Sequence, residues 1–417
     1  MKKINKFLIV LAFSSIFIGA TIPFTLIYLS GRQPTQSNLV HIYVNSTIYN
    51  SISSDITQYK QDIETQGYNV NMINWSSNNV TQLKNHLILG YSNGLIGAIL
   101  IGKLPYAKAR YWESWTTPPS SPPGPGIYRH FSCDYYLMDL DGYWSDVNTN
   151  GYYDVGAFDN NVEHNNGTAD WFPEIWVARI SPYTISEGGF NPINSLNNYF
   201  YRNHNLRIGL TYRPHRALLY IDDEWASYRN EWISNFTAYT GNNLTCESDY
   251  DYWNNDFTNS VNFLSNISDF THPNFTNYEL VHLMAHCNST DQLFGIATIV
   301  SQNNPLDGIL NYHQIYMNGP QPLFFNLYSC FSTNLMENNN IGTHYLFDGQ
   351  ALVVIGCSRS GGMSLYQPFY DSLRDGKIFG EAFKDWFYGP EIIPLNHWEE
   401  VYGMTFLGDP LLTIHMT

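Results

Sequence analysis

The sequence is poor in charged residues, and above all in basic ones. Only 13% of the 417 residues are charged, and 20 Lys and Arg stand against 36 Asp and Glu, which gives a formal net charge of −16. This balance argues against nucleic acid or an anionic membrane surface as the main partner. Aromatic residues are abundant, at 16%. Low charge with many aromatics is typical of a folded chain with a sizeable core.

Cysteine is also scarce, and its count is odd. The five cysteines are Cys133, Cys246, Cys287, Cys330 and Cys357. In an exported protein an odd count leaves at least one thiol that is free or paired between chains. A nucleophilic cysteine would supply such a thiol, although the count alone does not say which one it is.

The N-terminus predicts export. Lys2, Lys3 and Lys6 precede an uncharged apolar stretch at Phe7–Ser30, whose 24 residues exceed the roughly 20 that span a bilayer and the about 7–15 of a signal-peptide core. No convincing cleavage motif follows, which favours an uncleaved signal anchor over a cleaved signal peptide. A buried core helix would not explain the basic flank. The positive-inside rule then places the rest of the chain on the extracellular face of the cell membrane, or, after cleavage, makes it secreted.

Asparagine-linked glycosylation motifs agree with export and predict a glycoprotein. They occur at Asn45, Asn74, Asn79, Asn166, Asn235, Asn243, Asn266, Asn274 and Asn288. Occupied motifs mark surface loops. Several of the nine are expected by chance in a chain so rich in Asn, Ser and Thr, and we expect Asn288 to be unoccupied because it lies beside the candidate site described below.

Alternating strand and helix patterns predict an α/β fold. We expect strands at 39–44, 68–73 and 95–102, with helices between them, at 53–66 and 80–89. Ile56, Tyr59 and Ile63 have helical spacing and would form the buried face of the first helix. Such an order means a parallel sheet with right-handed crossovers. The predicted organisation is a signal segment and stalk at 1–38, an N-terminal subdomain at 39–208 and a catalytic subdomain at 209–417.

Two apolar runs of the second subdomain each end in a residue suited to catalysis. The runs are Tyr278–Ser289 and Pro322–Ser332, and both have the composition of buried strands. Ligands of open α/β sheets bind beyond the carboxyl ends of the strands. His286 and Cys330 fall at those ends, so neighbouring strands would bring an imidazole and a thiol together. A cysteine nucleophile with a histidine base needs this arrangement.

Five stretches in this order carry a resemblance to a known family. They are Ala98–Gly102 with Leu104-Pro105, Cys133–Tyr136 with Asp139–Gly142, Pro173–Ile180, the two apolar runs with Gly349–Ser358, and Gly380–Ala382 with Leu407–Leu412. The chain resembles the gingipain-like cysteine peptidases, relatives of caspases and legumains. The resemblance implies a caspase-like α/β sandwich, with mostly parallel sheets flanked by helices in two subdomains.

The resemblance also assigns roles. It implies that Cys330 is the nucleophile, that His286 is the base and acid, and that the backbone N–H groups of Cys287 and Cys330 form the oxyanion hole. The family usually has Gly-His-Gly where this chain has Ala285-His286-Cys287. Cys287 still has a backbone N–H, and such a donor to the oxyanion is worth about 3–4 kcal/mol. The oxyanion hole can therefore survive if the backbone conformation at this position is accessible to a residue with a Cβ.

Three further residues, His282, Cys357 and Asp134, have competing interpretations. His282 has the spacing of a core or supporting residue on the same strand face as His286. Cys357 is a competing nucleophile, but the family has only a small structural residue at its position. Asp134 aligns with an acidic residue of the specificity pocket in arginine-specific members, which implies a basic residue before the scissile bond. Alternatively, Asp134 holds the backbone of a strand-to-loop turn.

A calcium loop is a further candidate. Oxygen-bearing side chains alternate before and after a glycine turn, at Asp146, Asn148, Asn150 and Asp154. This is the spacing of the first half of a calcium loop, although Phe158 stands where such loops carry glutamate and Asp159 would have to replace it. The alternative is an Asx-rich surface turn. Catalysis by this class needs no metal, so such a calcium would be structural.

These observations predict an exported, membrane-anchored cysteine endopeptidase that acts on protein or peptide substrates. A transpeptidase that uses the same acyl-enzyme differs only in the acceptor. The alternative from a different functional class is an inactive relative that serves as a cell-surface binding or adhesion module. The reactivity of the Cys330 thiol separates the enzymes from the binding module.

Overall fold

The structure is a computed structural model. It describes residues 38–114, 125–146, 148–155, 172–248, 260–268, 278–295, 308–389 and 401–414. The predicted signal anchor at Phe7–Ser30 lies outside these ranges. Within them, no helix combines the length and the apolar character needed to cross a membrane.

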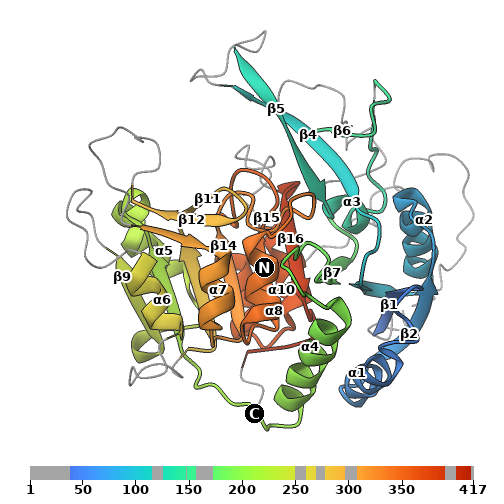
Figure 1. The fold of residues 1–417 in the computed structure, drawn as a ribbon, viewed down its shortest axis with the longest axis horizontal. Helices are drawn as coiled ribbons and strands as arrows, with labels where there is room; N and C mark the ends of the chain where they lie inside the picture. Colours follow the sequence, from blue (N-terminus) through green and yellow to red (C-terminus); the bar gives the residue numbers. More distant parts are fainter. Residues whose placement is uncertain are drawn as a thin grey trace, which may run out of the picture. The chain divides into compact units, whose positions relative to one another are not determined.

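One ten-stranded sheet runs through the described residues (Figure 1). Four mutually parallel strands lie in the order β2 (Asn69–Trp75), β1 (Leu39–Asn45), β3 (Leu95–Ile101) and β7 (Trp176–Ile180). Five more, parallel among themselves, lie in the order β15 (Val353–Cys357), β14 (Phe324–Tyr328), β10 (Leu280–Met284), β8 (Ala217–Ile221) and β9 (Leu244–Ser248). Between the two sets, β16 (Met404–Gly408) is antiparallel to β15 and pairs with β7. The mostly parallel sheet that the sequence predicts is confirmed.

The two expected helices lie between the first three strands as α1 (Ser53–Thr65) and α2 (Val80–Tyr91). Further helices between the main strands include α4 (Pro192–Arg207), α6 (Ser260–Ser268), α7 (Tyr312–Asn318) and α8 (Ile341–Asp348). Helix α1 buries Ile56, Tyr59 and Ile63, the face that the helical spacing predicts. Helix α2 begins where the side chain of Asn79 accepts the N–H groups of Thr81 and Gln82, which satisfies two donors at the start of the helix.

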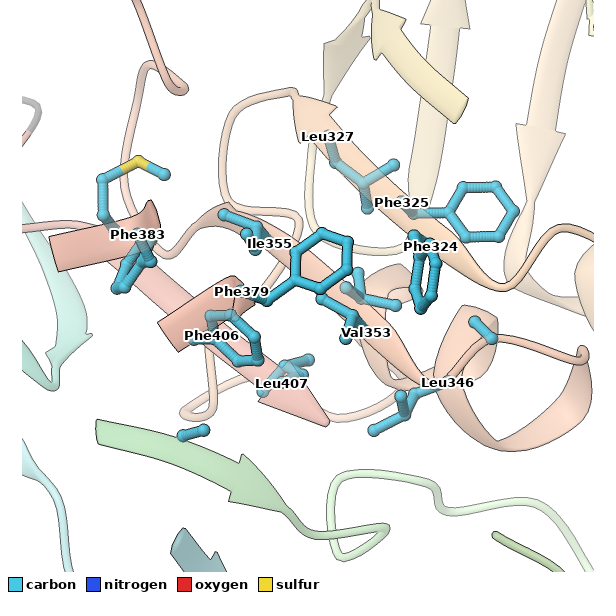
Figure 2. Close-up of a cluster of buried hydrophobic side chains, with 14 of the residues drawn as sticks. Phe324, Phe325, Leu327, Leu346, Val353, Ile355, Phe379, Phe383, Phe406 and Leu407 are labelled. Carbon is cyan, nitrogen blue, oxygen red and sulfur yellow. The ribbon is translucent and has the colours of Figure 1, made fainter. Parts of the chain in front are cut away.

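Helices cover both faces of the sheet. In β14, the Phe324 ring lies 4.6 Å from that of Phe379 on α10 (Phe379–Phe387). The ring of Phe325 lies 4.6 Å from that of Tyr345 on α8. Because successive residues of a strand point to opposite faces, α10 and α8 lie on opposite sides of the sheet. Figure 2 shows this apolar packing around β14, β15 and β16.

Two small sheets flank the main one. The first is a long hairpin of β4 (Ala107–Ser114) and β5 (Gly126–Cys133), extended by β6 (Tyr153–Asp154). The second consists of β11 (His286–Cys287), β12 (Asp291–Phe294) and β13 (Gly308–Asn311). The run at 278–289 is therefore two strands, β10 and β11, separated at Ala285.

The remaining elements are short. They are α3 (Tyr135–Met138), η1 (Asp223–Tyr228), α5 (Arg229–Asn235), η2 (Gly241–Asn243) and α9 (Gln367–Arg374). Strands β1, β2, β3 and β7 come from the predicted N-terminal subdomain, and β8, β9, β10, β14, β15 and β16 from the predicted catalytic one. The boundary at 208/209 falls just after α4 and remains a prediction.

Candidate active site

The pairing of β10 with β14 brings the two predicted catalytic residues to the same level. Met284 on β10 lies opposite Tyr328 on β14, and the strands are parallel. His286 and Cys330 each follow two residues later, so they have equivalent positions beyond the ends of adjacent strands. Parallel strands lie about 4.8 Å apart. The main-chain register therefore brings the imidazole and the thiol to one edge of the sheet, and both residues are partly exposed there.

A third residue, which was not predicted from the sequence, joins them. The Oε2 atom of Glu224 lies 2.5 Å from Nε2 of His286. Glu224 belongs to η1, directly after β8, which is the other neighbour of β10. Its local sequence signal is the acidic run Asp222–Glu224, which follows the apolar residues Ala217–Ile221. Three adjacent strands thus deliver a carboxylate, an imidazole and a thiol at their carboxyl ends.

The contact with Glu224 determines which ring nitrogen of His286 is basic. A carboxylate accepts the proton on Nε2, so the neutral imidazole carries its lone pair on Nδ1. The ring of Trp225 lies 4.6 Å from the imidazole and restricts its tilt. The His286 side chain is 22% exposed and the Glu224 side chain 34%. The pair is therefore reachable from solvent, as a site for a polymeric substrate requires.

The backbone of Cys287 can supply the expected oxyanion donor. Cys287 lies opposite Gln292 in the antiparallel β11–β12 pair, and the N–H of Asn288 donates to the C=O of Asp291 at 3.1 Å in the next pair. Hydrogen-bonded and non-hydrogen-bonded pairs alternate in such a ladder, so the Cys287 N–H points away from β12. The backbone of Cys287 is also outside the left-handed region, so its Cβ causes no strain.

The other thiols and the second histidine of the region are buried. Burial raises the pKa of the Cys287 thiol well above its ordinary value, and the neighbouring Cys330 adds to the rise. Cys357 is fully buried within β15. Burial lowers the pKa of His282 to about 3, and its Nδ1 lies 2.8 Å from the hydroxyl of Tyr370. His282 and Cys357 therefore support the structure around the site, whereas Cys287 lies beside Cys330 with its thiol buried.

Asp134 is not placed where a substrate can reach it. Its carboxylate is 2% exposed and accepts two hydrogen bonds from Arg179, at 2.6 Å from Nε and 2.7 Å from Nη2. Arg179 also donates to the carbonyls of Leu104 and Pro105. The guanidinium that this carboxylate holds is therefore the protein's own. The specificity role expected for Asp134 is therefore not supported.

The predicted calcium loop forms a turn held by its own backbone. Asp146 accepts the N–H groups of Asn150 and Gly151, and Asn148 accepts that of Asn150. Asp154 is buried and paired with Arg110 at 2.5 Å, so its carboxylate has a cation already. This pairing removes Asp154 from the expected ligand set, whereas calcium binding by Asp146, Asn148 and Asn150 remains a prediction.

A different acidic cluster could hold an ion such as calcium. One carboxylate oxygen from each of Asp139, Asp141 and Glu174 lies within 4.8 Å of the others. Burial raises the pKa of Glu174 to about 7, which the nearby carboxylates reinforce. The ammonium group of Lys84 donates to the carbonyl of Asp139 at 2.7 Å. Hard oxygen ligands suit calcium, whereas the positive charge of Lys84 beside them opposes a bound cation.

The fold is that of a known class of proteins. No family model matches the chain, and no curated protein matches its sequence. The described sheet and its flanking helices have the gingipain type of caspase-like fold. The solved structure that carries this likeness is the complex of the Porphyromonas gingivalis RgpB pro- and mature domains. It aligns with a TM-score of 0.55 and 12% identity, over 90% of this chain and 79% of that chain.

Proposed function

We propose that the protein is a cysteine endopeptidase in which Cys330 is the nucleophile, His286 the base and acid, and Glu224 the residue that orients His286. The observation that carries the proposal is the strand order β8, β10, β14, which puts these three side chains at the ends of adjacent parallel strands. The gingipain-type fold supports the same assignment.

The chemistry follows from these positions. Nδ1 of His286 takes the thiol proton, and the thiolate attacks the carbonyl carbon of a peptide bond. The developing oxyanion is stabilised by the backbone N–H groups of Cys287 and Cys330. The imidazolium then protonates the leaving amine, and water hydrolyses the thioester with His286 again as base. Glu224 stabilises the imidazolium through Nε2 while it carries both protons.

We also propose that the protein acts outside the cell. The basic residues before Phe7–Ser30 support a protein held at the extracellular face of the membrane, or secreted after cleavage. Protease treatment of intact cells that express the protein should degrade it, and carbonate washing should leave it in the membrane fraction. Loss of the protein on washing would contradict the anchor but not the activity.

Cleavage of peptides tests the function. We would incubate the purified protein with a peptide library under reducing conditions and identify the new termini by mass spectrometry. The proposal predicts cleavage by the unaltered protein and none by Cys330→Ala. New peptide bonds to an added amine would indicate a transpeptidase, and binding without cleavage would indicate the binding module. The library also measures the preference for the residue before the scissile bond, including the basic one that the sequence implied.

A further inference from the structure

The loop that follows β15 contacts the candidate nucleophile directly. We call residues Arg359–Gly361 the thiol loop. The N–H of Gly361 donates to Sγ of Cys330 at 3.3 Å. In the opposite direction, the N–H of Phe331 donates to the C=O of Arg359 at 2.8 Å. Two hydrogen bonds therefore fix the thiol loop against the turn that carries Cys330.

Both segments have unusual backbone conformations at this junction. Gly361 has φ of +120°, a region that residues with a Cβ rarely adopt, and Phe331 has φ of +56°. Left-handed conformations of residues with a side chain cost free energy and persist only where the surroundings hold them. The direction of the Gly361 N–H therefore depends on what anchors the loop.

The anchor comes from the hairpin β4–β5. The hydroxyl of Tyr111 lies 2.8 Å from Oγ of Ser360, and that Oγ also donates to Oε1 of Glu113 at 3.2 Å. The guanidinium of Arg359 lies 3.8 Å from the centre of the Tyr111 ring. Arg129 pairs with the other oxygen of Glu113 at 2.6 Å. The hairpin thus holds two of the three residues of the thiol loop.

We propose that the hairpin positions the Gly361 N–H to stabilise the thiolate of Cys330, with Tyr111 and Ser360 as positioning residues. Its importance for catalysis rests on the proposed function, but the effect on the thiol does not. A hydrogen bond to an ionised acceptor is roughly twice as strong as a neutral one, so this donor favours the thiolate over the thiol. It acts independently of the imidazole of His286.

Other groups near Cys330 also influence the ionisation of its thiol. The choice of variants separates their influence from that of the Gly361 N–H. His286 and Cys287 form β11 at the same end of the sheet, Cys287 interacts electrostatically with Cys330, and Arg359 lies on the thiol loop itself. Glu113 lies behind Ser360 but is neutralised by Arg129. The variants Ser360→Ala and Tyr111→Phe remove one hydroxyl each and change no charge, so any altered ionisation of Cys330 reports on the position of the loop.

The test measures alkylation of Cys330 by iodoacetamide, an uncharged reagent, between pH 4 and pH 9 in the full chain. Mass spectrometry gives the rate at this residue alone. We expect the midpoint of the profile to rise in Ser360→Ala and Tyr111→Phe, which slows alkylation about 3–10-fold on its acidic side and leaves the rate at pH 9 unchanged. Gly361→Ala should show a larger change, and the Ser360→Ala effect should persist when His286 is replaced by Ala.

Matched controls remove similar hydroxyls elsewhere. Ser372→Ala loses a hydrogen bond to Asp385, and Tyr136→Phe loses one to Thr81. Neither should change the profile. Profiles of Ser360→Ala and Tyr111→Phe that coincide with that of the unaltered protein would overturn the proposal. Shifted profiles in a protein that cleaves no peptide would instead uphold it and reject the proposed function.

Discussion

The carboxylate of Glu224 lies 2.5 Å from Nε2 of His286, and the two residues come from the ends of neighbouring parallel strands, 62 positions apart. This contact fixes the tautomer of the imidazole and leaves Nδ1 as the base. The two residues are far apart in the sequence and meet only in the folded chain. A substitution that removes this contact is therefore a specific test of the catalytic assignment.

Replacing Glu224 by Gln should slow catalysis without abolishing it. The amide can still accept the Nε2 proton but no longer stabilises the imidazolium, so we expect kcat/KM to fall about 10–100-fold, which corresponds to roughly 1.4–2.7 kcal/mol. Glu187→Gln is the matched control, because Glu187 also pairs with a histidine, His313, at 3.8 Å. Equal activities of the two variants would remove Glu224 from the mechanism.

Asp134→Asn should damage stability and leave specificity unchanged. The substitution leaves the buried guanidinium of Arg179 without its counter-charge, which typically costs about 3–5 kcal/mol. Urea denaturation measures the loss. Glu64→Gln, which breaks an exposed pair with Lys60, should cost under about 1 kcal/mol. If Asp134→Asn instead altered the preferred cleavage site at constant stability, the specificity role would be restored.

His282 should make the protein less stable in mild acid. Its folded pKa of about 3 lies below the ordinary 6.5, so between these values only the unfolded chain binds the proton. The stabilisation is present above pH 6.5 and is lost as the pH falls toward 3, by roughly 1–2 kcal/mol at pH 5. His41, with a pKa lowered to about 4 by burial and by His86, acts in the same direction, whereas Glu174 opposes it below pH 7.

Comparison of variants isolates the His282 contribution. His282→Gln should be less stable overall but should lose less stability between pH 7.5 and pH 5 than the unaltered protein does. His313→Gln removes an exposed histidine and should keep the full pH dependence. An unchanged slope in His282→Gln would show that His282 does not titrate as its burial requires.

Calcium should stabilise the protein through the cluster of Asp139, Asp141 and Glu174, and more at pH 8 than at pH 6. The pKa of Glu174 is about 7, so its carboxyl group can bind the ion only after it loses its proton. Thermal unfolding with and without calcium measures this, and Glu174→Gln should abolish the shift. If the shift survives in Glu174→Gln but disappears in Asp146→Asn, the predicted loop is the site instead.

The sequence was sufficient for the architecture, and it indicated two of the three residues of the proposed site. Buried strands leave continuous apolar runs, so the ends of two such runs pointed to His286 and Cys330. Glu224 could not be found in this way, because its role depends on β8 lying beside β10, and the strand order differs from the chain order. The ion pair of Asp134 could not be predicted either, because its partner, Arg179, lies 45 residues away and carries no local signal.

Covalent trapping at Cys330 tests most directly whether this residue is the nucleophile. Under reducing conditions, we would treat the protein with peptidyl ketone probes that carry Arg, Lys, Asp or Leu at the reactive end, and locate the adducts by mass spectrometry. We expect rapid modification of Cys330 that is lost in His286→Ala. A folded protein in which no probe modifies Cys330, or in which Cys357 is modified instead, would contradict it.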